Sequence, residues 1–209
     1  MDQEMRDAYT LWLCSLKGLG SASLYRLWRE SGEDPDFAGA WYRMAGEGGD
    51  TGETKRLQEI LRRGRKESSP QQLMEQLQNK NIHFVWPGNP GYPVRLKNIP
   101  DPPFALYFRG RLPEEKQPSV GIVGTRMASP YGREQARRFA SVLSAGGMQI
   151  ISGMAKGIDG IAGRGALDES DASFAVLGCG VDICYPKENR DLYEALCERG
   201  GVISEYRPG

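Results

Sequence analysis

Residues 119–126 read SVGIVGTR, residues 148–157 read MQIISGMAKG, and residues 173–180 read SFAVLGCG. In each stretch a short apolar run of strand length ends at a glycine-rich turn. A segment with helical periodicity follows each run, over residues 131–145, 158–167 and 189–197, and a further apolar run occupies residues 202–204. This alternation predicts an α/β protein with a Rossmann-like parallel sheet and with helices on both faces.

The chain ends at residue 209, directly after the last of these predicted strands and without a following helix. We therefore expect a Rossmann-like domain that is incomplete at its C-terminus. On the N-terminal side, residues 105–108 form another short apolar run, and six prolines fall between residues 87 and 103. Because proline lacks an N–H and fixes its φ angle, regular structure is expected to be sparse there.

The first 80 residues have a different pattern, with apolar residues at helical spacing. Residues 7–31 predict two helices around a tight turn at 17–20, with Ser21 or Ser23 as the cap of the second helix. Residues 55–80 predict two more helices, the second beginning near Pro70. The chain is thus expected to hold an all-α domain at 1–80 and a Rossmann-like domain at 81–209.

Between these two helix pairs, residues 44–54 are rich in glycine and acidic residues and predict a loop. The basic residues within 55–66 are interspersed with or flanked by Glu53, Glu59 and Glu67. A solvated helix face explains them better than a binding surface does.

Composition narrows the function classes. The 209 residues are 39% hydrophobic, which is typical of a globular protein and not of a disordered one. No apolar run approaches the roughly 18 residues of a membrane span, and the N-terminus lacks the basic start and apolar core of a secretion signal. We therefore expect a cytoplasmic protein without a membrane partner.

The formal net charge of zero hides an uneven distribution of charge. Residues 95–138 hold nine basic and four acidic side chains, whereas residues 139–209 hold six basic and ten acidic ones. A local basic face for nucleic acid is therefore compatible with the sum, because phosphate contacts depend on where Lys and Arg lie.

The counts of histidine and cysteine exclude several chemistries. His83 is the one histidine, and it opens an apolar run that predicts a strand. The four cysteines form no Cys-x-x-Cys motif, so we expect reduced thiols and no metal site. A Ser-His-Asp or Cys-His mechanism is disfavoured because the sequence has a single histidine.

The turns after the predicted strands combine glycines with cations and hydroxyls. Ligands bind at the carboxyl ends of parallel strands, where glycine lets the backbone approach an anion and helix N-termini offer free N–H groups. Arg126 and Lys156 are the cations, and turns by themselves require neither. The residues predicted to contact phosphate are Gly124, Thr125, Arg126, Ser129, Ser152, Gly153, Lys156 and Gly157.

Other interpretations of these turns remain open. Gly178 and Gly180 fit a binding site and ordinary turns equally well. For Asp159, a structural role at the start of a helix is favoured over a catalytic one. No Gly-x-Gly-x-x-Gly follows the first strand and no P-loop motif occurs, so neither a nicotinamide, flavin nor ATP cofactor is expected.

The turn between the first two helices carries a signal of its own. Gly18 and Gly20 flank Leu19, as in helix-hairpin-helix motifs that present backbone N–H groups to a DNA phosphate. The alternative is a packed helical hairpin without a ligand. Gly18 and Gly20 are therefore predicted as a secondary DNA contact, with both interpretations open.

Several motifs in order resemble the DNA-processing protein family known as DprA or Smf. They include VGIVGTR at 120–126, SGMAKGID at 152–159, GCGVD at 178–182, Tyr185-Pro186 with Asn189, and Ser204-Glu205. The resemblance implies an extended Rossmann-like domain that binds single-stranded DNA, preceded by a small SAM-like or helix-hairpin-helix-like domain. It also implies that Arg126 and Lys156 grip phosphates and that no catalysis occurs.

In this family the DNA-binding protein protects incoming DNA during natural transformation and loads the RecA recombinase, so the resemblance implies a RecA-type recombinase and a second copy of the chain as partners. Two departures stand out. Gly163 occupies the position where the family usually has histidine, and this glycine is expected to loosen the pocket wall or to alter how the DNA is held. The family also continues beyond residue 209, which puts the recombinase and dimer contacts in question.

The alternative from another class is a nucleotide hydrolase related to the lysine-decarboxylase-like phosphoribohydrolases, which have a related Rossmann core. Their Pro-Gly-Gly-x-Gly-Thr-x-x-Glu motif does not occur in this chain.

Overall fold

The computed structural model describes residues 1–45 and 52–209. The chain divides into two compact units, Met1–Leu106 and Tyr107–Gly209. The domain boundary predicted at residue 80 lies earlier than this division and stays a prediction. The first unit extends to Leu106 because the proline-rich segment packs onto its helices through buried aromatic side chains, among them Trp86 and Phe104.

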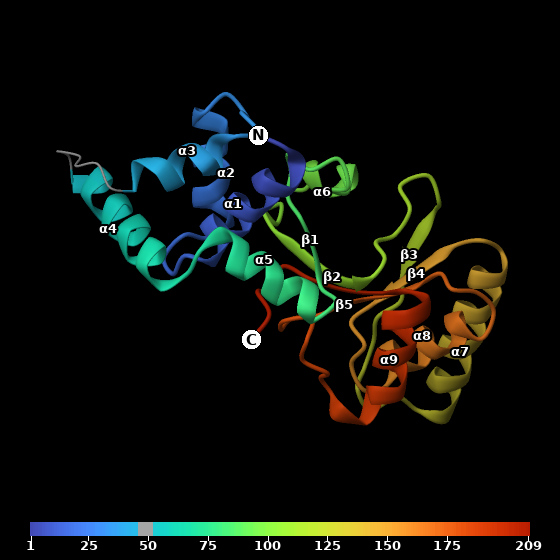
Figure 1. The fold of residues 1–209 in the computed structure, drawn as a ribbon. Helices are drawn as coiled ribbons and strands as arrows, with labels where there is room; N and C mark the ends of the chain where they lie inside the picture. Colours follow the sequence, from blue (N-terminus) through green and yellow to red (C-terminus); the bar gives the residue numbers. More distant parts are fainter. Residues whose placement is uncertain (46–51) are drawn as a thin grey trace. The chain divides into compact units, whose positions relative to one another are not determined.

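The first unit is mainly helical (Figure 1). The helices predicted within 7–31 and 55–80 are confirmed, and two additional helices, α3 and α6, were not anticipated. The predicted loop at 44–54 falls largely on residues 46–51, which lie outside the described residues. The elements are α1 (Gln3–Ser15), α2 (Ser21–Glu30), α3 (Phe37–Met44), α4 (Gly52–Glu67), α5 (Pro70–Asn79), β1 (His83–Val85) and α6 (Val94–Lys97).

The N-termini of α5 and α2 in this unit are capped in different ways. Ser69 caps α5 with a capping box that includes Gln72, and Pro70 takes the first helical position as expected. The expectation that a serine caps α2 is wrong. Gly20 is the N-cap residue of α2, and glycine has no side chain that could cap the helix. Ser21 is the first residue of the helix, and its hydroxyl accepts the N–H of Phe104 at 3.3 Å.

Asp7 of α1 fixes the segment that follows β1. Its two carboxylate oxygens accept hydrogen bonds from Trp86 Nε1 at 2.7 Å and from Asn89 Nδ2 at 2.9 Å. The Trp86 ring in turn lies 5.9 Å from the ring of Trp28 in an edge-to-face arrangement. These contacts order a stretch of chain whose prolines leave it few backbone hydrogen bonds of its own.

The second unit contains the predicted sheet, as strands β2 (Leu106–Gly110), β3 (Ser119–Gly121), β4 (Gln149–Ser152), β5 (Ser173–Val176) and β6 (Gly201–Ser204). Their order is β2-β6-β5-β4-β3. The four strands β3 to β6 are parallel, as predicted, and β2 pairs with β6 in the antiparallel sense. The fold is therefore α/β with a mixed sheet.

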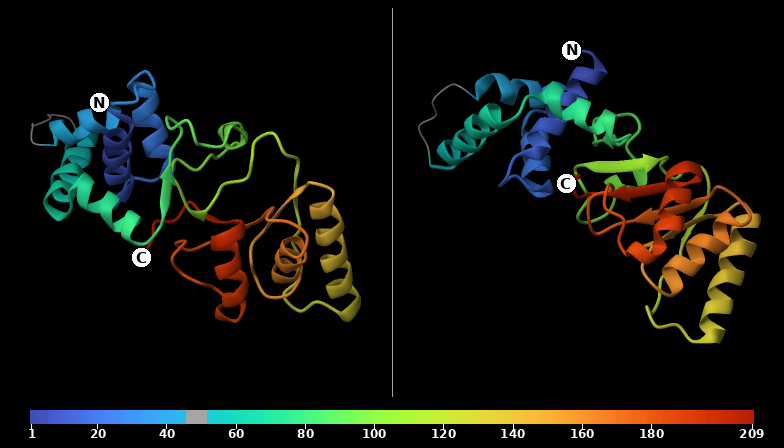
Figure 2. Two further views of the ribbon diagram at one scale, coloured as in Figure 1. Left: turned by 45° about the vertical axis from the view of Figure 1, so that its right-hand side comes forward. Right: turned by 60° about the horizontal axis from the view of Figure 1, so that its bottom comes forward.

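Three helices follow the parallel strands: α7 (Pro130–Ala145), α8 (Ile158–Leu167) and α9 (Arg190–Arg199). They form one layer on one face of the sheet (Figures 1 and 2). The expectation of helices on both faces is wrong for the described residues. Each parallel strand is added on the same side of the previous one, so right-handed crossovers place every helix on the same face.

The core under this helix layer is built from small residues. Ile150 of β4 packs against Ala140 of α7 and against Ala162 and Ala166 of α8, and all four are fully buried. A Cβ added at Gly165 of α8 would lie 2.8 Å from the carbonyl oxygen of Arg137 in α7. Close approach of α7 and α8 thus fixes where the preceding loops emerge. Among the residues described, no helix is both long and apolar enough to cross a membrane.

Candidate nucleic-acid interface

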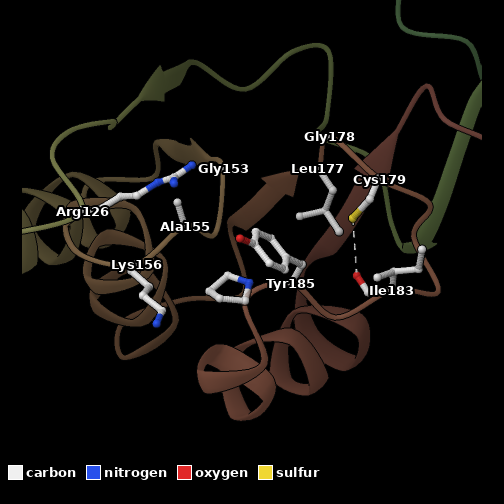
Figure 3. Close-up of a pocket in the computed structure, with 10 residues that line it drawn as sticks. Arg126, Gly153, Ala155, Lys156, Leu177, Gly178, Cys179, Ile183 and Tyr185 are labelled. Carbon is white, nitrogen blue, oxygen red and sulfur yellow. Dashed lines mark hydrogen bonds between the residues drawn. The ribbon is translucent and has the colours of Figure 1, made fainter.

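A cavity of about 410 Å³ opens at the carboxyl ends of β3, β4 and β5 (Figure 3). This is the edge of the sheet at which the sequence predicted a phosphate-binding crevice. Three separate connections supply its walls: the loop after β3, the loop after β4, and the segment between β5 and α9. The lining residues are Arg126, Gly153, Ala155, Lys156, Leu177, Gly178, Cys179, Ile183, Tyr185 and Pro186.

Two cations lie on one side of this cavity. Arg126 comes from the loop after β3 and Lys156 from the loop after β4, and Figure 3 shows both across the Tyr185 ring from Cys179 and Ile183. Within the part of the chain that the structure describes, the exposed Arg126 guanidinium makes no hydrogen bond or ion pair. It is therefore available to an anion.

Lys156 has a partner. Its ammonium group forms an ion pair with the carboxylate of Glu188, and both side chains are exposed. The hydrogen bond from Lys156 holds the pKa of Glu188 below its ordinary value. An anion that approaches Lys156 must displace this carboxylate.

The opposite side of the cavity is apolar. Leu177 and Ile183 line it, and Tyr185, which is 65% exposed, lies between them and the cations (Figure 3). Burial, together with the charge of Asp182, raises the pKa of the Cys179 thiol, so this group stays neutral at ordinary pH. The cavity thus pairs a cationic side with a neutral surface on which a flat ring can lie.

The predicted hydroxyl groups are engaged in local structure. Ser129 caps α7 and accepts the N–H of Gly132 at 3.2 Å. The Thr125 hydroxyl accepts the N–H of Met127 at 3.2 Å. Ser152 is only 6% exposed and donates to the carbonyl oxygen of Ile122 at 2.8 Å. None of these three residues lines the cavity.

The buried carboxylate of Asp159 engages two of the backbone N–H groups that were expected to face a phosphate. Gly124 donates to Oδ1 at 3.2 Å and Gly153 donates to Oδ2 at 3.1 Å. Asp159 is 7% exposed and lies in the first turn of α8, where the helix dipole favours a negative charge. These contacts agree with the structural role favoured for Asp159, because its carboxylate accepts hydrogen bonds from two backbone amides.

Gly157 brings the two loops together. Its φ of +81° suits glycine, and a Cβ there would lie 2.2 Å from the Thr125 carbonyl oxygen and 2.7 Å from that of Arg126. The next residue, Ile158, donates its N–H to the Thr125 oxygen at 3.2 Å. Of the eight predicted phosphate contacts, Arg126, Gly153 and Lys156 line the cavity, and the others hold the loops in place.

Sequence reasoning did not foresee how the segment after Pro186 is anchored beside the cavity. Asn189 is buried, and its Nδ2 donates to the carbonyl oxygens of Met154 at 2.9 Å and Ala155 at 3.2 Å. This anchors the short turn Lys187–Asn189 (η1), which carries Glu188, to the Lys156 loop. Tyr185, Pro186 and Asn189 already stood among the motif residues at 185–189, which was the available signal for a role of this segment.

Gly163 does not belong to the cavity wall. It lies in α8, and a Cβ there would meet the Leu192 side chain of α9 at 3.2 Å. The glycine found where the family usually has histidine therefore affects the contact between α8 and α9 and not the cavity lining.

Gly18 and Gly20 lie in the first unit, in the turn that precedes α2. Gly18 has a φ of +101°, and both glycines are exposed. A groove of about 630 Å³ beside this turn is lined in part by Gly18, Arg26, Trp41 and Arg56. The role of Gly18 and Gly20 as a secondary DNA contact stays a prediction. Over residues 1–45 and 55–209, no three His, Cys, Asp or Glu side chains gather as a metal site would require.

Fold and cavity together define a Rossmann-like α/β protein with a cation-bearing cavity at its strand ends. Residues 83–209 match the family described as DNA recombination-mediator protein A. The chain belongs to this family.

Related sequences and structures carry the names Smf and DprA. Protein Smf of Synechocystis sp. is 41% identical over 145 residues, which cover 68% of this chain and 36% of that protein. DNA processing protein DprA of Streptococcus pneumoniae is 38% identical over 118 residues, which cover 56% of this chain and 42% of that protein. The chain thus spans less than half the length of these relatives.

Solved structures also resemble this one, among them two of DNA processing protein A. The structure of Streptococcus pneumoniae DprA superposes with a TM-score of 0.76 at 27% identity, covering 97% of this chain and 68% of that one. DNA processing protein A of Helicobacter pylori, described for its single-stranded DNA binding mode, superposes with a TM-score of 0.53 at 28% identity, covering 61% of this chain and 56% of that one.

Proposed function

We propose that the second unit binds single-stranded DNA without performing catalysis on it. One observation carries the proposal: Arg126 and Lys156, from the ends of two neighbouring strands, lie over a single cavity whose opposite side is apolar. A cationic side fits phosphates, and a neutral side with an aromatic ring fits a base. The single-stranded DNA binding described for the Helicobacter pylori relative supports this assignment.

In this mechanism the two cations contact phosphates and release the counterions condensed on the strand, so affinity falls steeply with salt. A base stacks on the exposed face of Tyr185, which tolerates any base because each has a π-face. Tyr131, another exposed tyrosine of this unit, is 72% exposed but does not line the cavity. Tyr185 is therefore the better stacking platform.

The wider role follows from family membership. We propose that the protein protects incoming single-stranded DNA during natural transformation and helps to load a RecA-type recombinase, and that it forms a homodimer in doing so. Gly18 and Gly20 of the first unit are proposed as a secondary contact to the DNA backbone. The family resemblance supports these roles.

A titration of the chain with single-stranded and double-stranded oligonucleotides tests the DNA-binding proposal. Fluorescence anisotropy with oligo-dT and with a duplex of equal length, at several salt concentrations, should show preference for the single strand. Two phosphate contacts predict a slope of log K against log[salt] of about −1.4 from these cations. Equal affinity for both forms, or a slope near zero, would rule the proposal out. Release of free base from a nucleoside monophosphate would favour the hydrolase instead.

Glu188→Gln is expected to strengthen binding to single-stranded DNA. The change removes the carboxylate that pairs with Lys156, so a phosphate no longer competes with it. An exposed ion pair is weak, and we expect affinity to rise about threefold at low salt, with the salt slope nearly unchanged because the number of phosphate contacts stays the same.

Glu198→Gln is the matched control, because it removes the same charge from an exposed glutamate in α9 that does not line the cavity. Anisotropy titrations of both variants distinguish local competition from net charge. An equal gain in the two variants would show that the Glu188 pair does not regulate the site.

A further inference from the structure

Two loops carry the proposed DNA-binding cations, and one buried carboxylate accepts a hydrogen bond from each loop. The carboxylate of Asp159 receives the N–H of Gly124 from the loop after β3 and the N–H of Gly153 from the loop after β4. Arg126 follows Gly124 by two residues, and Lys156 follows Gly153 by three. The distance between the two cations therefore depends on how this carboxylate is held.

Asp159 has little freedom to move. It is 7% exposed, it lies in the first turn of α8, and α8 packs closely against α7. Among the described residues no Lys or Arg forms an ion pair with it, so the two amides and the helix N-terminus provide its compensation. A buried carboxylate with this arrangement is rigid, and it transmits that rigidity to both loops.

Packing around the carboxylate shows how closely the loops are fitted. A Cβ at Gly153 would lie 2.7 Å from Asp159 Oδ2, and a Cβ at Gly124 would lie 2.8 Å from Ile158. Side chains at either glycine would thus push the loops away from the start of α8.

The geometry points to Asp159 as a positioning residue for DNA binding: it clasps the two loops so that Arg126 and Lys156 face one strand together. The inference rests on the proposed function. It makes an unusual prediction, because a negative charge near a phosphate site weakens anion binding by simple electrostatics. If Asp159 acts by positioning, removing its charge weakens DNA binding; if it acts only as a nearby charge, removing it strengthens binding.

The variant Asp159→Asn tests this positioning role. The asparagine amide keeps the size of the side chain but replaces one acceptor oxygen with a donor, so one of the two glycine N–H groups loses its partner. We expect affinity for oligo-dT to fall about tenfold. In the DNA-free protein, amide hydrogen exchange at Gly124 or Gly153 should speed up by about tenfold or more.

Asp168→Asn provides a control for charge, since Asp168 is an exposed aspartate at the other end of α8. It should leave DNA binding and both amides unchanged. Gly153→Ala provides a second route, because its methyl group displaces the Asp159 carboxylate from the opposite loop. It should weaken DNA binding and speed exchange at Gly124, and it decides the matter if Asp159→Asn does not fold.

The outcomes separate the two proposals. Unchanged or tighter DNA binding by Asp159→Asn and Gly153→Ala, in a wild-type chain that does bind single strands, would overturn the positioning role alone. Unchanged exchange at both glycine amides would overturn it as well. If the wild-type chain binds no single-stranded DNA but the variants show the expected changes in amide exchange, the proposed function is overturned. The link that Asp159 makes between the two loops would then still stand.

Discussion

The double variant Arg126→Ala, Lys156→Ala is expected to lose at least about a hundredfold in affinity for single-stranded oligo-dT at low salt. Each side chain can supply one charge-assisted contact to a phosphate, and each such contact is worth about tenfold or more. The salt slope should flatten by about 1.4. Because both side chains are exposed, the melting temperature should stay nearly unchanged.

Lys116→Ala with Arg138→Ala is the matched control. It removes one lysine and one arginine from exposed positions of the same unit, neither of which lines the cavity. Anisotropy titrations should show a small, uniform loss for this pair. If the control loses as much affinity as the cavity variant, binding depends on general charge and the cavity is not the site. If the cavity variant binds like the wild type, Arg126 and Lys156 are not the phosphate contacts.

Gly157→Ala is expected to reduce both stability and DNA binding. The residue has φ +81° and ψ −129°, a conformation that alanine adopts only with strain of about 1–3 kcal/mol. Its methyl group would also meet the Thr125 carbonyl oxygen at 2.2 Å, which forces the two cation-bearing loops apart. Denaturant unfolding should show the loss of stability, and oligo-dT affinity should fall about tenfold.

Gly147→Ala separates strain from loop displacement. Gly147 has φ +83°, but nothing lies within 4 Å of a Cβ at that position, and it precedes β4, whereas the cavity lies at the carboxyl end of that strand. It should lower the free energy of unfolding while leaving DNA affinity unchanged. Wild-type DNA affinity in Gly157→Ala would show that the approach of the two loops is not needed for binding.

Much of the fold was predictable because local patterns and tertiary packing agree. The helix expected over residues 158–167 is α8 with the same bounds, and the four parallel strands lie where the apolar runs predict them. The one-sided helix layer was not anticipated, because it depends on strand order and no residue pattern encodes that order directly. Helix α3 was missed because it is short and contains Gly39 within an aromatic segment.

For the site, residue types at strand ends correctly brought Arg126, Gly153 and Lys156 to one cavity. The fate of the amides and hydroxyls could not be foreseen. The partner of the Gly124 N–H lies 35 residues away in Asp159, and that of the Ser152 hydroxyl lies 30 residues away in Ile122. Hydrogen bonds over such separations depend on how loops meet in three dimensions, which spacing alone does not encode.

The small residues of α8 have a consequence for how this protein can diverge. At Gly160, Gly163 and Gly165 a side chain would approach Asn189, Leu192 and the Arg137 backbone within 2.8 to 3.2 Å. The helix is therefore closed to enlargement toward each of these neighbours, while the tips of Arg126, Lys156 and Tyr185 project from three separate connections. Substitutions that change ligand preference can therefore be accommodated in the connections but hardly in the helix. The fold can stay constant while the specificity of the cavity changes.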